Sequence, residues 1–221
     1  MSTKNPRRRK RSRPIRRKSA NNPNLSLPYK LLWAVVGLFL TIGGTFMEPS
    51  TTTLPWNWAS ESGVQTYALG VTFQVGAVLL VGCLGGKQSG ALSQIIYILL
   101  GLFLPRFRIF THGGGLDYII EPTFGYLLGF IPGAWICGSL AFRTKPTLEA
   151  LAFSCFCGLF TIHLLGIIYL IGLHLFGFID EGFIALLQDI LQYSLRPLFG
   201  QSTIVCGVSV LAFALRRIMF Y

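Results

Sequence analysis

Acidic residues are scarce in this sequence, and the motifs by which many enzymes hold a metal, position a serine nucleophile or bind a phosphate are missing. The chain has eight Asp and Glu among 221 residues, and its three histidines stand far apart. It contains no His-Glu-x-x-His, Gly-x-Ser-x-Gly or Walker-type glycine loop. We therefore expect no enzymatic activity, no cofactor and no ATP hydrolysis by this chain alone.

Cysteine pairs with metal-site spacing are also missing. The five cysteines all lie inside apolar runs, and no Cys-x-x-Cys occurs. Cys155 and Cys157 are two residues apart, so they would face different directions on a helix. We expect no metal site and interpret the cysteines as buried free thiols, at Cys83, Cys137, Cys155, Cys157 and Cys206.

Apolar residues, by contrast, are abundant and occur in blocks. They make up 52% of the chain, and the mean hydropathy is +0.58. The net charge of +11 is concentrated in residues 1–30, which hold eleven Lys and Arg and no acid. This distribution favours a disordered basic tail over a nucleic-acid-binding surface. The tail either sets the topology, which we favour, or attracts anionic membrane lipid.

The apolar blocks predict an all-α integral membrane protein, a bundle of six transmembrane helices formed by residues 31–221. A glycine-rich joint at 85–90 is short enough to force the second and third helices into an antiparallel hairpin. Residues 176–193 carry three acids among apolar residues and predict an amphipathic segment on the membrane surface. The six helices are expected at 31–47, 67–84, 91–104, 122–142, 148–173 and 197–217.

The distribution of charge between the loops predicts that both termini are cytoplasmic. In that orientation, inner segments hold sixteen of the nineteen basic residues and outer segments hold seven of the eight acids. The inner basic residues are those of the tail together with Lys87, Arg143, Lys145, Arg216 and Arg217.

The same topology brings polar groups from four segments toward the outer surface. Polar side chains in a membrane domain are costly unless they pair or line a cavity, so these groups indicate a small-ligand pocket. The alternative, that a group only satisfies a neighbouring helix, stays open for Thr123 and is favoured for His163. The predicted pocket residues are Gln74, His112, Gly113, Gly114, Gly115, Thr123, Tyr126 and Gln201.

Residues 110–130 join two of the predicted helices and contain the most distinctive motif. Pro122 suits the first turn of a helix. Gly125 and Gly129 share one helix face and predict close packing against another helix. From Gly114 the sequence reads Gly-Gly-Leu-x-Tyr-x-x-x-Pro-Thr-x-Gly-Tyr-Leu-x-Gly-Phe. This pattern resembles the BioY family, the biotin-binding S components of energy-coupling factor (ECF) transporters, and residues 100–105 and 151–169 also resemble that family.

The resemblance implies a multi-pass protein of the cell membrane that binds biotin from outside. It would deliver biotin together with an ECF transmembrane coupling subunit and two ABC ATPases. The small-residue face of Ala34, Gly37 and Thr41 is the expected contact with that coupling subunit. Alternatives are an S component or facilitator for another vitamin or small solute, a scaffolding membrane protein, and an intramembrane enzyme.

The sequence departs from the family pattern near the start of the sixth helix. The family has an acid and a nearby lysine there, whereas this chain has Gln201 and no lysine. A glutamine offers a ligand a neutral carbonyl instead of a carboxylate. Glu121 and Phe124 also stand where the family pattern usually has glycine. These differences leave the ligand and its affinity open.

Overall fold

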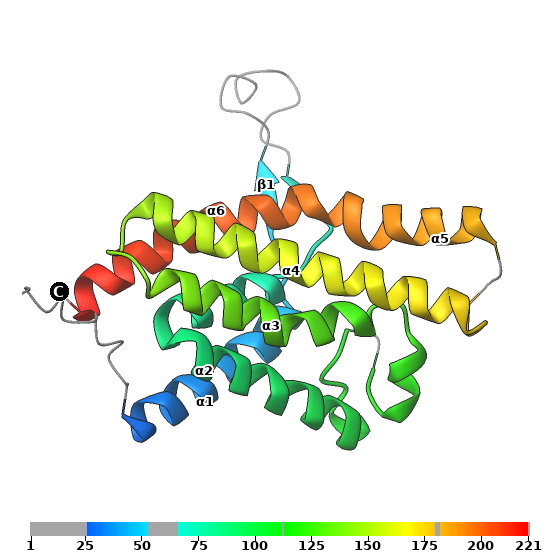
Figure 1. The fold of residues 1–221 in the computed structure, drawn as a ribbon, viewed down its shortest axis with the longest axis horizontal. Helices are drawn as coiled ribbons and strands as arrows, with labels where there is room; N and C mark the ends of the chain where they lie inside the picture. Colours follow the sequence, from blue (N-terminus) through cyan, green and yellow to red (C-terminus); the bar gives the residue numbers. More distant parts are fainter. Residues whose placement is uncertain (1–25, 53–65, 112, 180–181, 221) are drawn as a thin grey trace, which may run out of the picture.

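Long apolar helices make up most of the structure, a computed structural model that describes residues 26–52, 66–111, 113–179 and 182–220. Within these ranges five helical stretches are long and apolar enough to cross a membrane. The fold is therefore that of a multi-pass, mostly helical membrane protein (Figure 1). The stretches are α1 (Leu27–Thr45), α2 (Gln74–Phe103), α3 (Phe124–Ala141), α4 (Leu148–Leu175), and Phe183–Met219, which contains α5 (Phe183–Ile190) and most of α6 (Arg196–Phe220).

Helix α2 folds back on itself at Gly86, as the glycine-rich joint predicts. Gly86 has φ 79° and ψ 175°, a conformation that glycine adopts easily and that lies outside the α-helical region. Gln74 and Tyr97 are hydrogen-bonded at 2.8 Å, although 23 residues of straight helix would separate them by about 34 Å. The hairpin is confirmed, and its two arms lie antiparallel.

The first arm of α2 begins later than expected. The sequence predicts a helix from Tyr67, but residues 66–68 form the strand β2 (Thr66–Ala68). This strand pairs antiparallel with β1 (Ser50–Thr52), with Ser50 opposite Ala68. Pairing with a distant segment has overridden the local apolar pattern. The expected helix start at Tyr67 is therefore wrong.

The helices pack around α2, which contacts α1, α3, α4 and α6, while α4 also contacts α3 and α6. Glycines on α3 bring it very close to α4. A Cβ atom added to Gly129 would lie 2.9 Å from the carbonyl oxygen of Ile162, and one added to Gly125 would overlap Tyr169. The close helix packing predicted from these two glycines is confirmed.

Helix α1 corrects two expectations. It begins at Leu27, with Pro28 in its first turn, so residues 27–30 belong to the helix, and residues 1–25 lie outside the described residues. Ala34, Gly37 and Thr41 are buried, and a Cβ on Gly37 would lie 2.8 Å from Val81 of α2. This face packs within the chain, so it is not an exposed contact for a coupling subunit.

The predicted surface segment at 176–193 is wrong for its part from Phe183 onward, and residues 180–181 of it lie outside the described residues. From Phe183 the chain is helical through α5, a π-helical turn (Leu191–Leu195) and α6, and in Figure 1 α5 continues the line of α6 beside α4. His174 at the end of α4 and Asp189 of α5 lie 3.6 Å apart (Nε2 to Oδ2). This contact helps to hold the extension against α4.

The five cysteines are free, as expected, but two of them are not buried. Cys206 of α6 is exposed and Cys157 of α4 is half-buried, whereas the other three lie in the core. An apolar run in a membrane helix includes the outward-facing side of that helix, so a position within the run does not guarantee burial. The expectation of burial is therefore wrong for Cys206 and Cys157.

Among the described residues, basic residues expected on the inner side lie at one end of the bundle, where α6 ends in Figure 1. A Cβ on Gly138 of α3 would lie 2.5 Å from the backbone nitrogen of Lys87. Arg216 donates a hydrogen bond from Nη1 to the carbonyl oxygen of Ala141 at 2.7 Å, and Arg217 lines a groove with Leu148. This arrangement agrees with the charge pattern of the sequence.

Candidate functional site

The glycine loop, residues 113–115, packs directly on the end of α2, at the end of the bundle opposite the basic residues. Gly115 donates its backbone N–H to the carbonyl oxygen of Gly101 at 2.9 Å. A Cβ on Gly114 would lie 2.7 Å from that oxygen, so a larger residue would push the loop away. Gly113 pairs with Phe110 through two backbone hydrogen bonds. His112 lies outside the described residues.

Gln74 belongs to a buried polar network that joins three segments. Its Nε2 donates to the hydroxyl of Tyr97 at 2.8 Å, and that hydroxyl donates to the carbonyl oxygen of Ile109 at 3.3 Å. Thr45 Oγ1 of α1 lies 3.4 Å from the same hydroxyl. Gln74 therefore connects the start of α2, the end of α1 and the approach to the glycine loop.

Gln201 and Tyr126 meet at a second polar cluster, formed around His163 of α4. Gln201 Oε1 and His163 Nε2 are 2.7 Å apart, and the hydroxyls of Tyr126 and Ser194 are 2.6 Å apart. The Tyr126 and His163 rings are edge-to-face with centroids at 5.7 Å. The helix-to-helix hydrogen bond expected for His163 is confirmed.

The orientation of the Gln201 amide in this structure pairs its oxygen with His163 Nε2. A side-chain amide oxygen only accepts, so Nε2 donates and Nδ1 of the neutral ring keeps its lone pair. Nδ1 is buried and has no hydrogen-bond partner among the described residues. His163 is 6% exposed, so this acceptor is withdrawn from solvent. Such an acceptor suits a ligand that carries an N–H group.

Aromatic rings connect the Gln74 network, the glycine loop and α4. Tyr97 contacts Phe110, with ring centroids 5.3 Å apart, and Phe110 contacts Tyr118 at 4.7 Å. Phe124 continues the row from Tyr118 to Tyr169, at 6.4 and 5.9 Å. Four of these five rings are buried in the core, so the row is a packed aromatic layer between the polar groups at this end of the bundle.

The expected pocket residues therefore fall into separate groups. Gln201 and Tyr126 share the His163 cluster, whereas Gln74 lies in the Tyr97 network. Thr123 is 3.0 Å from the Tyr118 hydroxyl (Oγ1 to O), next to the glycine loop. Three further members of these groups, Tyr97, Tyr118 and Ser194, were not predicted. Each is a polar group within or beside an apolar segment, and that is the one signal the sequence offers for them.

Comparison with known proteins identifies related sequences. Over 189 residues the chain is 28% identical to an uncharacterized 21.2 kDa protein in the psbX-ycf33 intergenic region of Cyanophora paradoxa, covering 86% of this chain and 95% of that protein. It is 41% identical over 101 residues to the probable biotin transporter BioY of Lysinibacillus sphaericus, covering 45% and 50%. It is 39% identical over 108 residues to the biotin transporter BioY of Thermotoga maritima, covering 48% and 59%. The chain thus spans half to three fifths of these two transporters.

The fold is similar to that in the 2.1 Å crystal structure of the S-component for biotin from an ECF-type ABC transporter. The TM-score is 0.61, the identity is 18%, and the match covers 87% of this chain and 95% of that chain. At this identity the likeness concerns the fold. The sequence profile of the BioY family matches residues 52–219, which is most of the chain, and the chain therefore belongs to the BioY family.

Proposed function

We propose that this chain binds biotin at the outer side of the cell membrane and delivers it for uptake as the S component of an ECF-type transporter. The observation that carries the proposal is the family match over 52–219, which includes Gln74, His163 and Gln201. Support also comes from relatives named biotin transporters and from the fold of a biotin S-component. BioY is a family of transport proteins, so the chain is not an enzyme.

The binding site of this proposal lies where α3, α4 and α6 meet beside the glycine loop. Biotin carries two ureido N–H donors and one ureido oxygen. The unpartnered Nδ1 of His163 is an acceptor for one donor, held in the required tautomer by Gln201. Gln201 stands where the family has an acid. In this proposal it orients His163 through their hydrogen bond and also offers its own amide to the ligand. Tyr126, Thr123 and the glycine loop complete the proposed site, with Gln74 behind it.

Uptake further requires a partner that hydrolyses ATP. The chain has no phosphate-binding loop, so the proposal includes an ECF transmembrane coupling subunit and two ABC ATPases. It also includes six membrane spans, counting the two arms of α2 separately, with both termini in the cytoplasm. The buried face of α1 leaves its exposed apolar face, with Leu31, Val35 and Phe39, for lipid or for the coupling subunit.

Titration calorimetry of the purified chain with biotin tests this proposal. We expect the parent protein to bind biotin and Gln201→Ala to bind it at least roughly tenfold more weakly. The change removes the hydrogen bond that orients His163 and removes one polar contact with the ligand. Gln192→Ala is the matched control, since Gln192 is an exposed glutamine of the π-helical turn and is not part of the His163 cluster. Absence of biotin binding by a well-folded parent would refute the ligand.

A panel of other vitamins in the same calorimeter tests the second candidate, an S component for a different solute. This candidate is favoured by one observation, the amide of Gln201 in place of the family acid. A ligand that binds more tightly than biotin, and that also loses affinity in Gln201→Ala, would replace biotin in the proposal.

A further inference from the structure

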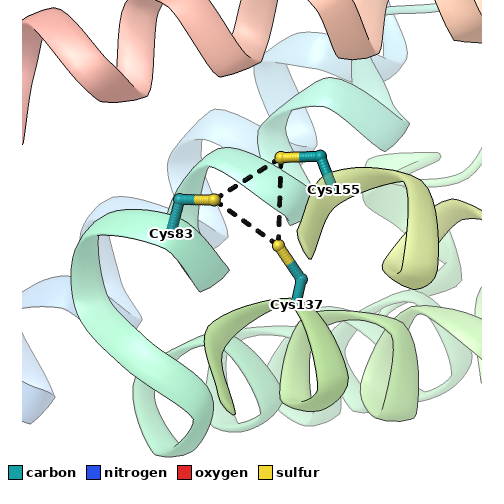
Figure 2. A group of neighbouring side chains, drawn as sticks. All are labelled: Cys83, Cys137 and Cys155. Atoms are coloured by element: carbon teal, nitrogen blue, oxygen red, sulfur yellow. Dashed lines mark hydrogen bonds between the residues drawn. The ribbon is translucent and has the colours of Figure 1, made fainter. Parts of the chain in front are cut away.

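Three cysteines from three different helices meet in the core, well away from the His163 cluster. Cys83 of α2, Cys137 of α3 and Cys155 of α4 point their sulfurs toward one another (Figure 2). The Sγ–Sγ distances are 3.5 Å for Cys83–Cys137, 3.5 Å for Cys83–Cys155 and 4.0 Å for Cys137–Cys155. All three side chains are 0% exposed. Sequence spacing could not reveal this group because each cysteine lies on its own helix.

Glycines next to these cysteines bring the three helices close enough for the sulfurs to converge. A Cβ on Gly82 would lie 3.0 Å from the carbonyl oxygen of Ala134, and one on Gly158 would lie 3.0 Å from Cys137 Cβ. The sulfurs are thus held by closely packed backbone, which leaves the side chains little room to disperse. The cluster is preorganised.

We propose that Cys83, Cys137 and Cys155 form a binding site for Cu(I). Thiolate sulfur is the ligand that soft ions such as Cu(I) prefer. The three distances place the point equidistant from the sulfurs about 2.1 Å from each, close to the metal–sulfur length of about 2.3 Å known for zinc thiolates. A small displacement out of the sulfur plane gives the full bond length.

The number of ligands distinguishes Cu(I) from Zn(II). Structural zinc sites are almost always tetrahedral with four ligands. Among the described residues, the cluster contains three metal-binding side chains and no fourth His, Cys, Asp or Glu. Cu(I) is stable with three sulfur ligands, so this site favours Cu(I).

The charge of a Cu(I) site can be balanced within the apolar core. If two thiols each release a proton to water and the third stays protonated, Cu(I) with two thiolates and one thiol carries one negative charge. Arg216 supplies a buried positive charge nearby. It is 4% exposed and bonds the carbonyl oxygen of Ala141, one helical turn from Cys137. The negative site and the guanidinium would therefore offset each other, as a buried charge requires.

The test uses the full chain purified in detergent, reduced and kept free of oxygen. Cu(I), supplied as its acetonitrile complex, is titrated in competition with a coloured chelator, and Zn(II) is titrated in parallel. We expect one Cu(I) per chain, only sulfur neighbours in X-ray absorption, and at least roughly tenfold weaker Zn(II) binding. The measurement does not involve biotin, so failure of the Cu(I) site and failure of the proposed function can be told apart.

Two kinds of variant decide the assignment. Cys137→Ser should lower Cu(I) affinity at least roughly tenfold, whereas Cys206→Ser, which changes an exposed cysteine, should leave it unchanged. Because a core variant can fold poorly, the melting temperature is measured with and without Cu(I). A bound ion should raise it in the parent and in Cys206→Ser but not in Cys137→Ser. Absence of Cu(I) binding by the folded parent, or full binding by the Cys83, Cys137 and Cys155 triple serine variant, would overturn the site.

Discussion

At the scale of single residues, Tyr97 shows how this protein reconciles polar groups with an apolar core. Its side chain is 0% exposed, and its hydroxyl lies between Gln74, Thr45 and the carbonyl oxygen of Ile109. Buried polar groups are costly unless they are hydrogen-bonded, so the hydroxyl satisfies partners that would otherwise be orphaned. Tyr97 lies within an apolar run of the sequence, yet its hydroxyl contacts residues of three segments.

Replacing Tyr97 with Phe tests this assignment. The variant keeps the ring but leaves the Gln74 amide and the Ile109 carbonyl without their partner. We expect the free energy of unfolding to fall by about 1–3 kcal/mol. Thermal unfolding in detergent measures the change. Tyr193→Phe is the control, because the Tyr193 hydroxyl makes no hydrogen bond within the described residues. Equal stability of the two variants would contradict the network.

At the scale of elements, Gly86 decides whether α2 is one long helix or a hairpin. Apolar residues continue on both sides of it, and only the backbone reversal lets Gln74 reach Tyr97. The reversal also places Lys87 beside Trp135, with its ammonium 5.1 Å from the ring centre. A cation–π contact of this kind further stabilises the turn.

Gly86→Ala should destabilise the protein by about 1–3 kcal/mol, since a Cβ disfavours the positive φ of this position. Gly43→Ala offers a matched comparison within α1. A Cβ on Gly43 meets nothing within 4 Å, and alanine favours helix, so stability should stay the same or rise by up to about 1 kcal/mol. Denaturant titration of both variants provides the measurement. A Gly86→Ala protein as stable as the parent would mean that the turn does not need glycine.

At the scale of the whole molecule, the two ends of the bundle differ in chemistry. Lys87, Arg216 and Arg217 lie at the end where the chain turns from α3 to α4, a turn that contains Arg143 and Lys145, and the other end carries the glycine loop and both polar clusters. The positive-inside rule relates basic ends to the cytoplasm. We therefore propose that the end with the glycine loop faces the outside, as capture of an external solute requires.

Labelling with a membrane-impermeant thiol reagent tests this orientation in intact cells. We expect Asp117→Cys, beside the glycine loop, to be labelled, and Thr144→Cys, between α3 and α4, to be labelled only after the cells are opened. Both positions are exposed in the structure, so access to either is limited by the membrane alone. The parent chain, which keeps Cys206, serves as the background control. The reverse pattern would place the basic end outside.

Local patterns were sufficient for the class of fold and for its main helices. Apolar blocks predict membrane helices, the glycine-rich joint predicts the reversal at Gly86, and Gly125 and Gly129 predict close packing of α3. These features depend on residues near in sequence, so the sequence contains them directly. The motif from Gly114 to Phe130 indicates the BioY family for the same reason, because its glycines and aromatic residues lie within one short segment.

Long-range packing decided the rest. The β1–β2 pairing displaced the start of α2, and residues 183–193 continue α6 beside α4 instead of forming a separate surface segment. Ala34, Gly37 and Thr41 are buried against α2, so they do not form an exposed surface for a partner protein. Both sites also depend on long-range packing. Gln201 and His163 lie on different helices, and each of the three clustered cysteines lies on its own helix. The sequence by itself determined which segments are helical and apolar, since that depends on neighbouring residues. Only the tertiary structure decided which side chains meet, since that depends on how those helices pack.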